Sequence, residues 1–259
     1  MKNTLFRIFA LFLAALAFFF VVYPILAIFL DLTVSKLLKT LQDGEVWTSL
    51  RISFVAAVCA ATLGSLLGLP AGYLLARGHL RRELFESLLN LPIVIPHVAV
   101  GILLLNVLNS NAFLGRLLAP LGLSFVDTFA GLVVAMCFVS FSYVVSAALM
   151  GFSSVSEELE LAARTLGASP WYVFRRITGP LIFPYLMRGF ILAVARGVSE
   201  MGALLIIAYY PKTASILLYE RFENYGLSEV EAITALIVFV SLLLFAILMY
   251  FSQKVEKDA

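Results

Sequence analysis

The sequence has 259 residues, of which 62% are hydrophobic and only 13% are charged. Soluble domains are nearer half apolar and a quarter charged, so this composition excludes an ordinary soluble protein and predicts a single membrane domain over residues 1–259. The formal net charge of +2 is too small to favour a nucleic-acid partner. Cys59 and Cys137 lie in apolar runs with no further ligand nearby, which predicts two buried small hydrophobes and no metal site.

Six apolar stretches predict an all-α integral membrane fold with six transmembrane helices. They lie at about residues 5–30, 49–76, 88–108, 128–150, 181–208 and 228–251, and we expect loops at 31–47, 109–127 and 209–227 and a short charged tail at 253–259. The first stretch is longer than the apolar core of a signal peptide and has no small-residue cleavage site after it, so we expect it to be retained. Ser228 and Glu231 have capping spacing and are expected to start the last helix.

Small residues recur every four positions in the second stretch: Ala56, Ala60, Gly64, Gly68 and Gly72. At that spacing they lie near one face of a helix, where small side chains let two backbones approach closely. The alternative is simple tolerance of glycine in a membrane helix. Five small residues in register favour a tight helix–helix seam.

Pro92 and Pro96 interrupt the third stretch, and His97 follows directly. Prolines free backbone carbonyls that must be buried in protein or face a water-filled cavity. A structural kink is the favoured interpretation, and a broken helix at a translocation path is the alternative. His97 has no carboxylate partner in view and is interpreted as structural.

Polar residues also occur inside the fourth and fifth stretches. The fourth contains Ser140, Ser142, Tyr143 and Ser146, whose hydroxyls either bond carbonyls of their own helix or line a pathway. The fifth contains Arg188, Arg196 and Glu200 beside a second small-residue face, Gly189, Ala193 and Gly197. Arg196 and Glu200 are four residues apart and can pair, which offsets part of the cost of charge in a membrane. Structural pairing or a gate latch is favoured over direct substrate binding.

Residues 154–180, between the fourth and fifth stretches, are too polar to enter lipid. Ser154 and Glu157 have the spacing of a capping box, and an apolar stripe follows at helical spacing (Leu159, Ala162, Ala163 and Leu166). Gly167 can close this helix in a left-handed conformation, and Ser169-Pro170 can start another. The pattern predicts two short helices around a glycine turn, exposed and in need of a partner.

This stretch resembles the cytoplasmic loop of ABC importer permeases, which has the pattern Glu-Ala-Ala, three residues, Gly, nine residues, Ile, one residue, Leu-Pro. The matching positions here are Ala162-Ala163, Gly167, Ile177 and Pro180, whereas Leu161 and Gly179 replace the Glu and the Leu. The resemblance implies that the loop, about residues 152–180, is a coupling helix that docks on a separate ATPase subunit. The residues implicated in this coupling are Glu157, Glu158, Glu160, Ala162, Ala163, Gly167 and Trp171.

Basic residues are more numerous in the segments on the side of this loop than in the opposite loops. The positive-inside rule therefore predicts a cytoplasmic coupling loop and two cytoplasmic termini. The sequence has no GxxxxGK[ST], HExxH or GxSxG motif, so we expect no enzyme and no cofactor in this chain. The resemblance places ATP and Mg²⁺ on the partner ATPase.

Residues 195–227 resemble the molybdate and tungstate permeases, in which a Glu–aromatic/Met–Gly–Ala segment follows an Arg. The corresponding residues are Arg196, Ser199, Glu200, Met201, Gly202 and Ala203. The resemblance implies import of an oxyanion, most simply tungstate or molybdate, and sulfate or thiosulfate is the alternative within the same class. An ion-coupled secondary transporter using Arg196 and Glu200, and a scaffold that binds an ATPase but moves nothing, stay open as other classes.

The same resemblance implies a second copy of the chain, two ATPase subunits, an extracytoplasmic oxyanion-binding protein and surrounding membrane lipid as partners. The gate or pathway candidates are Ser140, Tyr143, Arg196, Ser199 and Glu200. The candidates for docking the binding protein, all in the loop at 209–227, are Tyr209, Lys212, Tyr219, Arg221 and Glu223.

Overall fold

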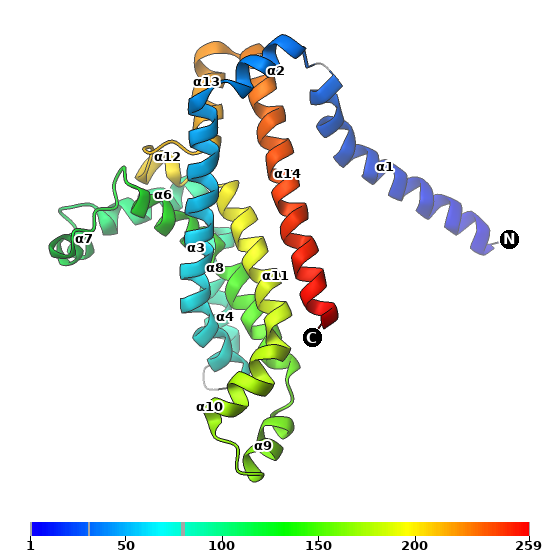
Figure 1. The fold of residues 1–259 in the computed structure, drawn as a ribbon, viewed down its shortest axis with the longest axis vertical. Helices are drawn as coiled ribbons and strands as arrows, with labels where there is room; N and C mark the ends of the chain where they lie inside the picture. Colours follow the sequence, from blue (N-terminus) through cyan, green and yellow to red (C-terminus); the bar gives the residue numbers. More distant parts are fainter. Residues whose placement is uncertain (1, 31, 79–80, 259) are drawn as a thin grey trace.

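In the computed structural model, which describes residues 2–30, 32–78 and 81–258, the chain is a bundle of helices (Figure 1). In chain order the elements are α1 (Lys2–Leu30), α2 (Val34–Leu41), α3 (Gly44–Ala76), α4 (Arg82–Leu89), α5 (Leu91–Val94), α6 (His97–Leu108), α7 (Phe113–Leu118), the 3₁₀ turn η1 (Ala119–Leu121), α8 (Phe129–Ser154), α9 (Glu157–Thr165), α10 (Pro170–Val173), the π-helical turn η2 (Phe174–Thr178), α11 (Gly179–Val198), α12 (Leu204–Ile207), α13 (Ala214–Tyr225) and α14 (Leu227–Asp258).

Within the described ranges, five helical stretches are long and apolar enough to cross a membrane. They are Phe6–Leu30, Gly44–Ala76, Phe129–Ser154, Pro170–Val198 and Leu227–Tyr250. A sixth candidate is a broken pair, His97–Leu108 and Phe113–Leu121, which bends by 55°. The prediction of an all-helical membrane protein is confirmed, whereas the third stretch is not the continuous helix that we expected.

The core lies where α3, α8 and α11 pack together. All five small residues of the ladder on α3 are buried, and a Cβ added at Gly72 would lie 2.5 Å from Ala148 Cβ of α8. Gly197 of α11 makes a similar approach, because its added Cβ would lie 3.1 Å from Ala57 Cβ of α3. The tight seam predicted from spacing is therefore confirmed, and α8 fills the centre of the bundle.

The proline-containing third stretch is broken twice. Asn90 separates α4 from α5, and the extended residues Ile95 and Pro96 separate α5 from α6. The break frees the carbonyl of Leu89, which accepts a hydrogen bond of 2.7 Å from Ser142 Oγ of α8. The stretch is thus broken and not merely kinked, and a neighbouring hydroxyl satisfies the freed carbonyl. A translocation path at the break stays a prediction.

The fifth stretch also differs from its prediction. Its helix begins earlier, running from Pro170 through η2 into α11, and ends at Val198 instead of near Ala208. Residues 199–203 are not helical before the single turn of α12 begins. Two interrupted helices therefore meet in the upper half of the bundle, where α6 and α12 lie side by side (Figure 1).

Segments predicted as loops contain short helices. The loop at 31–47 holds α2, that at 109–127 holds α7 and η1, and that at 209–227 holds α13. Thr213 caps α13 by accepting from Ile216 N, and Ile216 and Leu217 are buried beneath it. These helices are shorter than a membrane span, and their polar residues conceal the helical period in the sequence.

Three smaller predictions are wrong. Helix α14 already begins at Leu227, so Ser228 and Glu231 do not start it, and Glu231 pairs instead with Lys36 of α2 at 3.1 Å. The expected tail at 253–259 continues α14 as far as Asp258, and Ala259 lies outside the described residues. Cys59 is exposed on the face of α3 turned away from the core, whereas Cys137 is buried as predicted.

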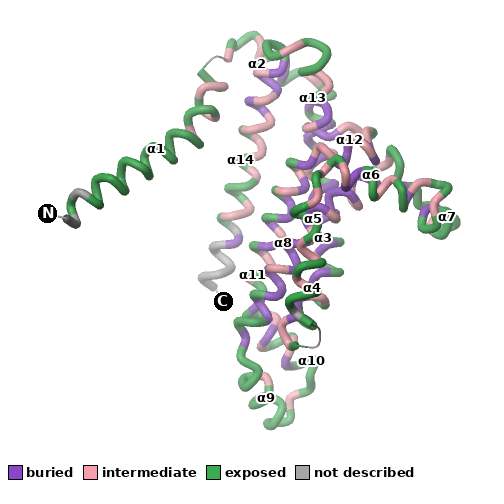
Figure 2. The backbone as a smooth tube through the Cα atoms, turned by 180° about the vertical axis from the view of Figure 1, so that it is seen from behind, coloured by how far each residue is buried: buried purple, intermediate pink, exposed green. Residues whose placement is uncertain are grey.

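Most of helix α1 projects away from the bundle (Figure 1), and part of it lies next to α14. Within its apolar stretch, Phe6–Leu30, none of the residues is buried, and Figure 2 shows this helix almost wholly in the colour of exposed residues while α3 and α8 carry the buried ones. An apolar helix with this exposure needs lipid or another protein chain to cover it.

Candidate functional site

Two short helices, α9 and α10, form the end of the molecule opposite α2 and α13 (Figure 1). Helix α9 begins after Ser156, whose hydroxyl accepts a hydrogen bond from Glu158 N at 3.2 Å. The predicted cap, Ser154, is wrong because α8 continues through that residue and its hydroxyl donates to Gly151 O. The cap therefore lies two residues further along the chain.

The turn between α9 and α10 has the geometry predicted for it. Gly167 has φ +89°, in the left-handed region that favours glycine. Ala168 N donates to Ala163 O at 3.1 Å across this turn. Ser169 Oγ accepts from Tyr172 N at 3.2 Å, and Pro170 occupies the first turn of α10. The two helices are thus fixed at both sides of the turn.

Large apolar side chains are exposed around this turn. Leu166 is 89% exposed and Trp171 is 68% exposed, and Leu159, Leu161 and Tyr172 are also exposed. The carboxylates of Glu157 and Glu158 face outward beside them, Ala162 is exposed and Ala163 is half-buried. Apolar surface of this kind, on a polar segment outside the membrane stretches, is typical of a protein–protein contact.

Glu160 is the most buried of the three acidic residues at the start of α9, and it pairs with Arg77 more closely than Glu157, whose Oε1 lies 3.7 Å from Arg77 Nη1. Glu160 Oε1 accepts a 2.7 Å hydrogen bond from Arg77 Nη2 at the end of α3 and a 2.6 Å hydrogen bond from Thr178 Oγ1 of η2. Arg77 Nη1 also donates to Val155 O, between α8 and α9, at 3.2 Å. Neither Arg77 nor Thr178 is among the predicted site residues. The one sequence feature that could have pointed to Arg77 is its position directly after the helix with the small-residue ladder.

A second polar cluster lies where the interrupted helices α6 and α11 meet. Glu200 is fully buried, and its Oε2 lies 2.8 Å from Arg196 Nη2 and 2.6 Å from His97 Nδ1. Its other oxygen, Oε1, accepts from Ala203 N at 2.8 Å. The predicted pairing of Arg196 with Glu200 is confirmed, and both carboxylate oxygens are satisfied.

The interpretation of His97 as a residue without a carboxylate partner is wrong. The ring reaches Glu200 because α6 begins at His97, immediately after the break at Pro96. Gly202 permits this approach, since a Cβ added there would lie 2.8 Å from His97 Cβ. The two residues are far apart in the chain, so no spacing rule could have paired them.

The remaining pathway candidates occupy varied positions. Ser140 Oγ donates to Met136 O of its own helix, which agrees with the backbone-bonding alternative for that residue. Tyr143 is half-buried on α8. Ser199 is exposed, and its hydroxyl accepts from Arg196 Nη1 at 3.3 Å beside the buried carboxylate.

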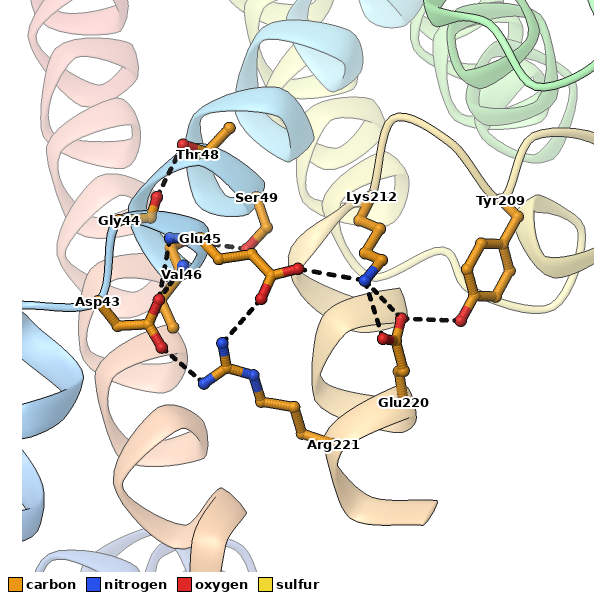
Figure 3. Close-up of polar contacts among 10 residues, drawn as sticks. All are labelled: Asp43, Gly44, Glu45, Val46, Thr48, Ser49, Tyr209, Lys212, Glu220 and Arg221. Atoms are coloured by element: carbon orange, nitrogen blue, oxygen red, sulfur yellow. Dashed lines mark hydrogen bonds and ion pairs between the residues drawn. The ribbon is translucent and has the colours of Figure 1, made fainter. Parts of the chain in front are cut away.

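A third cluster joins α3 to the segment 209–225 at the opposite end of the molecule (Figure 3). Arg221 donates to Asp43 at 2.6 Å and to Glu45 at 2.8 Å, while Lys212 bonds Glu45 at 3.1 Å and Glu220 at 2.8 Å. Tyr209 donates to Glu220 at 2.9 Å. Three of the predicted docking residues (Tyr209, Lys212 and Arg221) are therefore held in contacts within the chain, whereas Tyr219 and Glu223 are exposed.

These contacts perturb the ionisation of the cluster. The hydrogen bond to Glu220 raises the pKa of Lys212, and in return the hydrogen bond from Lys212 lowers the pKa of Glu220. Burial opposes the ionisation of Asp43, but hydrogen bonds from Arg221 and from Glu45 N outweigh it and lower the Asp43 pKa. The cluster is therefore fully charged near neutral pH.

Among the described residues, no group of three or more His, Cys, Asp or Glu side chains is arranged to hold a metal ion. The clusters just described instead contain paired charges and hydrogen bonds.

Comparison with known proteins assigns the class. A family model described as binding-protein-dependent transport system inner membrane component matches residues 64–258. The chain belongs to this family, and it is the non-catalytic, multi-pass inner-membrane permease of an ABC importer. A component of such a system works with a binding protein and an ATPase.

The chain is also similar to individual permeases. The chain is 44% identical over 241 residues to the molybdate/tungstate transport system permease protein WtpB of Thermococcus kodakarensis, covering 91% of this chain and 92% of that protein. It is 42% identical over 249 residues to the protein of the same name from Pyrococcus abyssi, covering 94% and 95%. A probable sulfate transport system permease protein cysT of Nephroselmis olivacea is 30% identical over 217 residues, covering 82% and 76%.

Solved structures support the fold. A bacterial alginate ABC transporter in complex with a pentasaccharide-bound periplasmic protein matches with a TM-score of 0.73 at 17% identity, covering 96% of this chain and 95% of that chain. The MetNI methionine ABC transporter in an inward-facing conformation matches with a TM-score of 0.62 at 16% identity, covering 81% and 94%. At these identities the likeness concerns the fold alone.

Proposed function

We propose that this chain forms the translocation path of an importer for tungstate or molybdate. The proposed substrate rests on sequence identity. The chain is 42–44% identical, over nearly its full length, to permeases named for molybdate and tungstate, and 30% identical to the permease named for sulfate. The proposed mode of transport, import that depends on a separate binding protein, rests on the family membership. Sulfate or thiosulfate is the competing substrate, and the experiment below distinguishes the two.

The substrate test uses the binding protein that partners this permease. Calorimetric titration with tungstate, molybdate and sulfate is expected to give the tightest binding for tungstate or molybdate. Uptake of the same anions into proteoliposomes containing the permease, the ATPase and the binding protein should follow the same order. Tightest binding of sulfate would overturn the proposed substrate, and uptake by the permease alone under an ion gradient would indicate a secondary transporter.

The surface around α9 and α10 is proposed to dock the ATPase. Support comes from its exposed Leu166 and Trp171, its outward carboxylates Glu157 and Glu158, and its position outside the membrane stretches. ATP and Mg²⁺ would be held by that partner. Hydrolysis changes the shape of the partner, and the permease responds only because the surface makes different contacts with the two partner states.

The sidedness follows from this docking surface. With α9 and α10 cytoplasmic, α2 and α13 lie outside, and the broken pair α6–α7 completes six crossings with the coupling loop between the fourth and fifth. Both chain ends are then cytoplasmic, and the exposed Tyr219 and Glu223 face the binding protein. Lys212 and Tyr209 contact Glu220 of α13, and Arg221 joins α13 to the start of α3.

The polar cluster of Arg196, Glu200 and His97, with the adjacent Ser199, is proposed as a gate latch. It closes across the two helix breaks, where rigid segments on either side can move separately. Ser140 and Tyr143 of α8 are the remaining pathway candidates. A second copy of the chain is the proposed partner for the exposed helix α1, and lipid covers the rest of the apolar surface.

A further inference from the structure

Glu160 contacts its own chain more closely than its acidic neighbours do, since its carboxylate lies 2.7 Å from Arg77 Nη2 whereas that of Glu157 lies 3.7 Å from Arg77 Nη1. Glu160 lies directly before Leu161, the residue that replaces the acidic residue of the loop pattern, and Leu161 is 56% exposed. The side chain of Glu160 is only 20% exposed, compared with 65% for Glu157. The acidic residue nearest the motif is therefore turned inward, and an apolar residue takes the outward position.

The partners of Glu160 belong to separate parts of the bundle. Arg77 follows the last turn of α3, and Thr178 ends the π-helical turn that leads into α11. Both donate to the same oxygen, Glu160 Oε1. Arg77 also donates to Val155 O in the connection from α8. One carboxylate and one guanidinium thus tie α9 to all three helices of the core.

Because the partners of Glu160 are buried, breaking this contact costs free energy. The side chain of Arg77 is 7% exposed and Thr178 is 2% exposed. Removing the Glu160 carboxylate would leave the buried guanidinium with Glu157 Oε1, 3.7 Å from Nη1 and on a side chain that is 65% exposed, as its remaining counter-ion. Loss of the closer and more buried partner of such a pair is destabilising. Among the residues that the structure describes, Arg77 Nε has no hydrogen-bond partner, so the guanidinium depends on its two Nη groups for compensation.

We propose that the Arg77–Glu160–Thr178 contact is the link through which movement of α9 reaches α3 and α11. Glu160 is a positioning residue that acts through Arg77 and not through the ATPase. This inference rests on the proposed function, because it presumes that α9 docks on an ATPase. Residues 155 and 156, which connect α8 to α9, are non-helical, and without the tie α9 would pivot there instead of moving with the core.

The test uses the complete complex of permease, ATPase and binding protein in proteoliposomes. The variants are Glu160→Gln, Thr178→Val and Thr178→Ser, and Glu83→Gln serves as the control, since Glu83 is an exposed carboxylate in α4 of the same region. We expect Glu160→Gln and Thr178→Val to lower the number of anions imported per ATP hydrolysed by about 5-fold or more, the lower end of typical coupling between sites. Pull-down of the ATPase should be unchanged, and Thr178→Ser and Glu83→Gln should match wild type.

A charge exchange, Arg77→Glu with Glu160→Arg, guards against simple misfolding. The double variant should recover part of the number of anions imported per ATP that Arg77→Glu or Glu160→Arg alone loses, because the ion pair is restored. Loss of ATPase pull-down by Glu160→Gln but not by Arg77→Met would overturn the proposal by showing that Glu160 contacts the ATPase directly. A wild-type import ratio in Glu160→Gln and Thr178→Val would also overturn it. Failure of the wild-type complex to import any of the three anions would instead count against the proposed function.

Discussion

Glu200 shows how a charged residue is accommodated inside a membrane protein. Its carboxylate is fully buried, yet it receives hydrogen bonds from Arg196, from Ala203 N and from the His97 ring. Charge at this depth is costly unless it is paired and its lone pairs are satisfied. The neighbouring Ser215 donates to Glu200 O at 2.8 Å, which also fixes the backbone where α11 has ended.

We expect Glu200→Leu to destabilise the protein by about 3–5 kcal/mol, because Arg196, whose side chain is only 19% exposed, would lose its partner carboxylate. Replacing both residues, Arg196→Met with Glu200→Leu, should recover most of that loss. Thermal unfolding of the purified permease in detergent measures both effects. If the pair is a latch, the double variant should be stable but import poorly. Full import by the double variant would contradict a role in gating.

The outer cluster gives a pH-dependent prediction. The pKa values of Asp43 and Glu220 are lowered from 3.8 and 4.5, so each stabilises the folded state when ionised. That contribution is complete above these ordinary pKa values and is lost as the pH falls from about 4.5 through the lowered values. Thermal unfolding in detergent at about pH 7, 5 and 3.5, values that bracket this window, should show the loss at the lowest pH.

Arg221→Met should reduce this pH dependence, because it removes the donor that lowers the Asp43 pKa. The control is Lys39→Met, since Lys39 and Glu229 form a 3.6 Å pair whose side chains are 81% and 53% exposed. An exposed pair of this kind contributes little, so its variant should keep the wild-type profile. Identical profiles for Arg221→Met and wild type would argue against the assigned cause.

At the scale of helices, the seam between α3 and α8 depends on residues without side-chain bulk. Gly72 lies so close to Ala148 and Leu149 that an added Cβ would be 2.8 Å from Leu149 N. Backbone atoms at that distance cannot yield without a shift of the helix. The seam therefore fixes how closely the two helices pack, and with it the position of Arg77 five residues further along α3.

We expect Gly72→Val to destabilise the protein by about 1–3 kcal/mol or more, through the forced separation of α3 and α8. Gly44→Ala is the matched control, because Gly44 lies on the same helix and nothing is within 4 Å of an added Cβ there. Thermal unfolding in detergent compares the two. Equal midpoints for the two variants would show that the seam has room to adjust.

At the scale of the whole molecule, the proposed sidedness can be tested by chemical labelling. In a background lacking Cys59 and Cys137, single cysteines are placed at Leu166 (89% exposed) and at Tyr225 (68% exposed), at opposite ends of the bundle. A membrane-impermeant maleimide should label Tyr225→Cys in intact cells or spheroplasts and Leu166→Cys only after permeabilisation. The reverse pattern would place the α9–α10 surface outside and contradict ATPase docking.

The amino-acid sequence alone was enough to predict the membrane class, most of the spans, the small-residue seam and the glycine turn at Gly167. These features depend on composition and on residues within a few positions of each other, where helical period and backbone preference act directly. It also identified the Arg196–Glu200 pair, because four residues of separation place two side chains on one helix face.

The tertiary structure alone decided which polar groups meet across the bundle. His97 reaches Glu200 because a proline break lets α6 begin beside α12, and Glu160 reaches Arg77 because α9 lies near the residue that follows α3. Such contacts join residues some 80 to 100 positions apart, and their energy depends on burial, which no local pattern encodes. Which charges pair in the interior depends on which side chains the fold brings close together. An unpaired charge in a low-dielectric interior is strongly destabilising, so the folded chain places such groups next to each other.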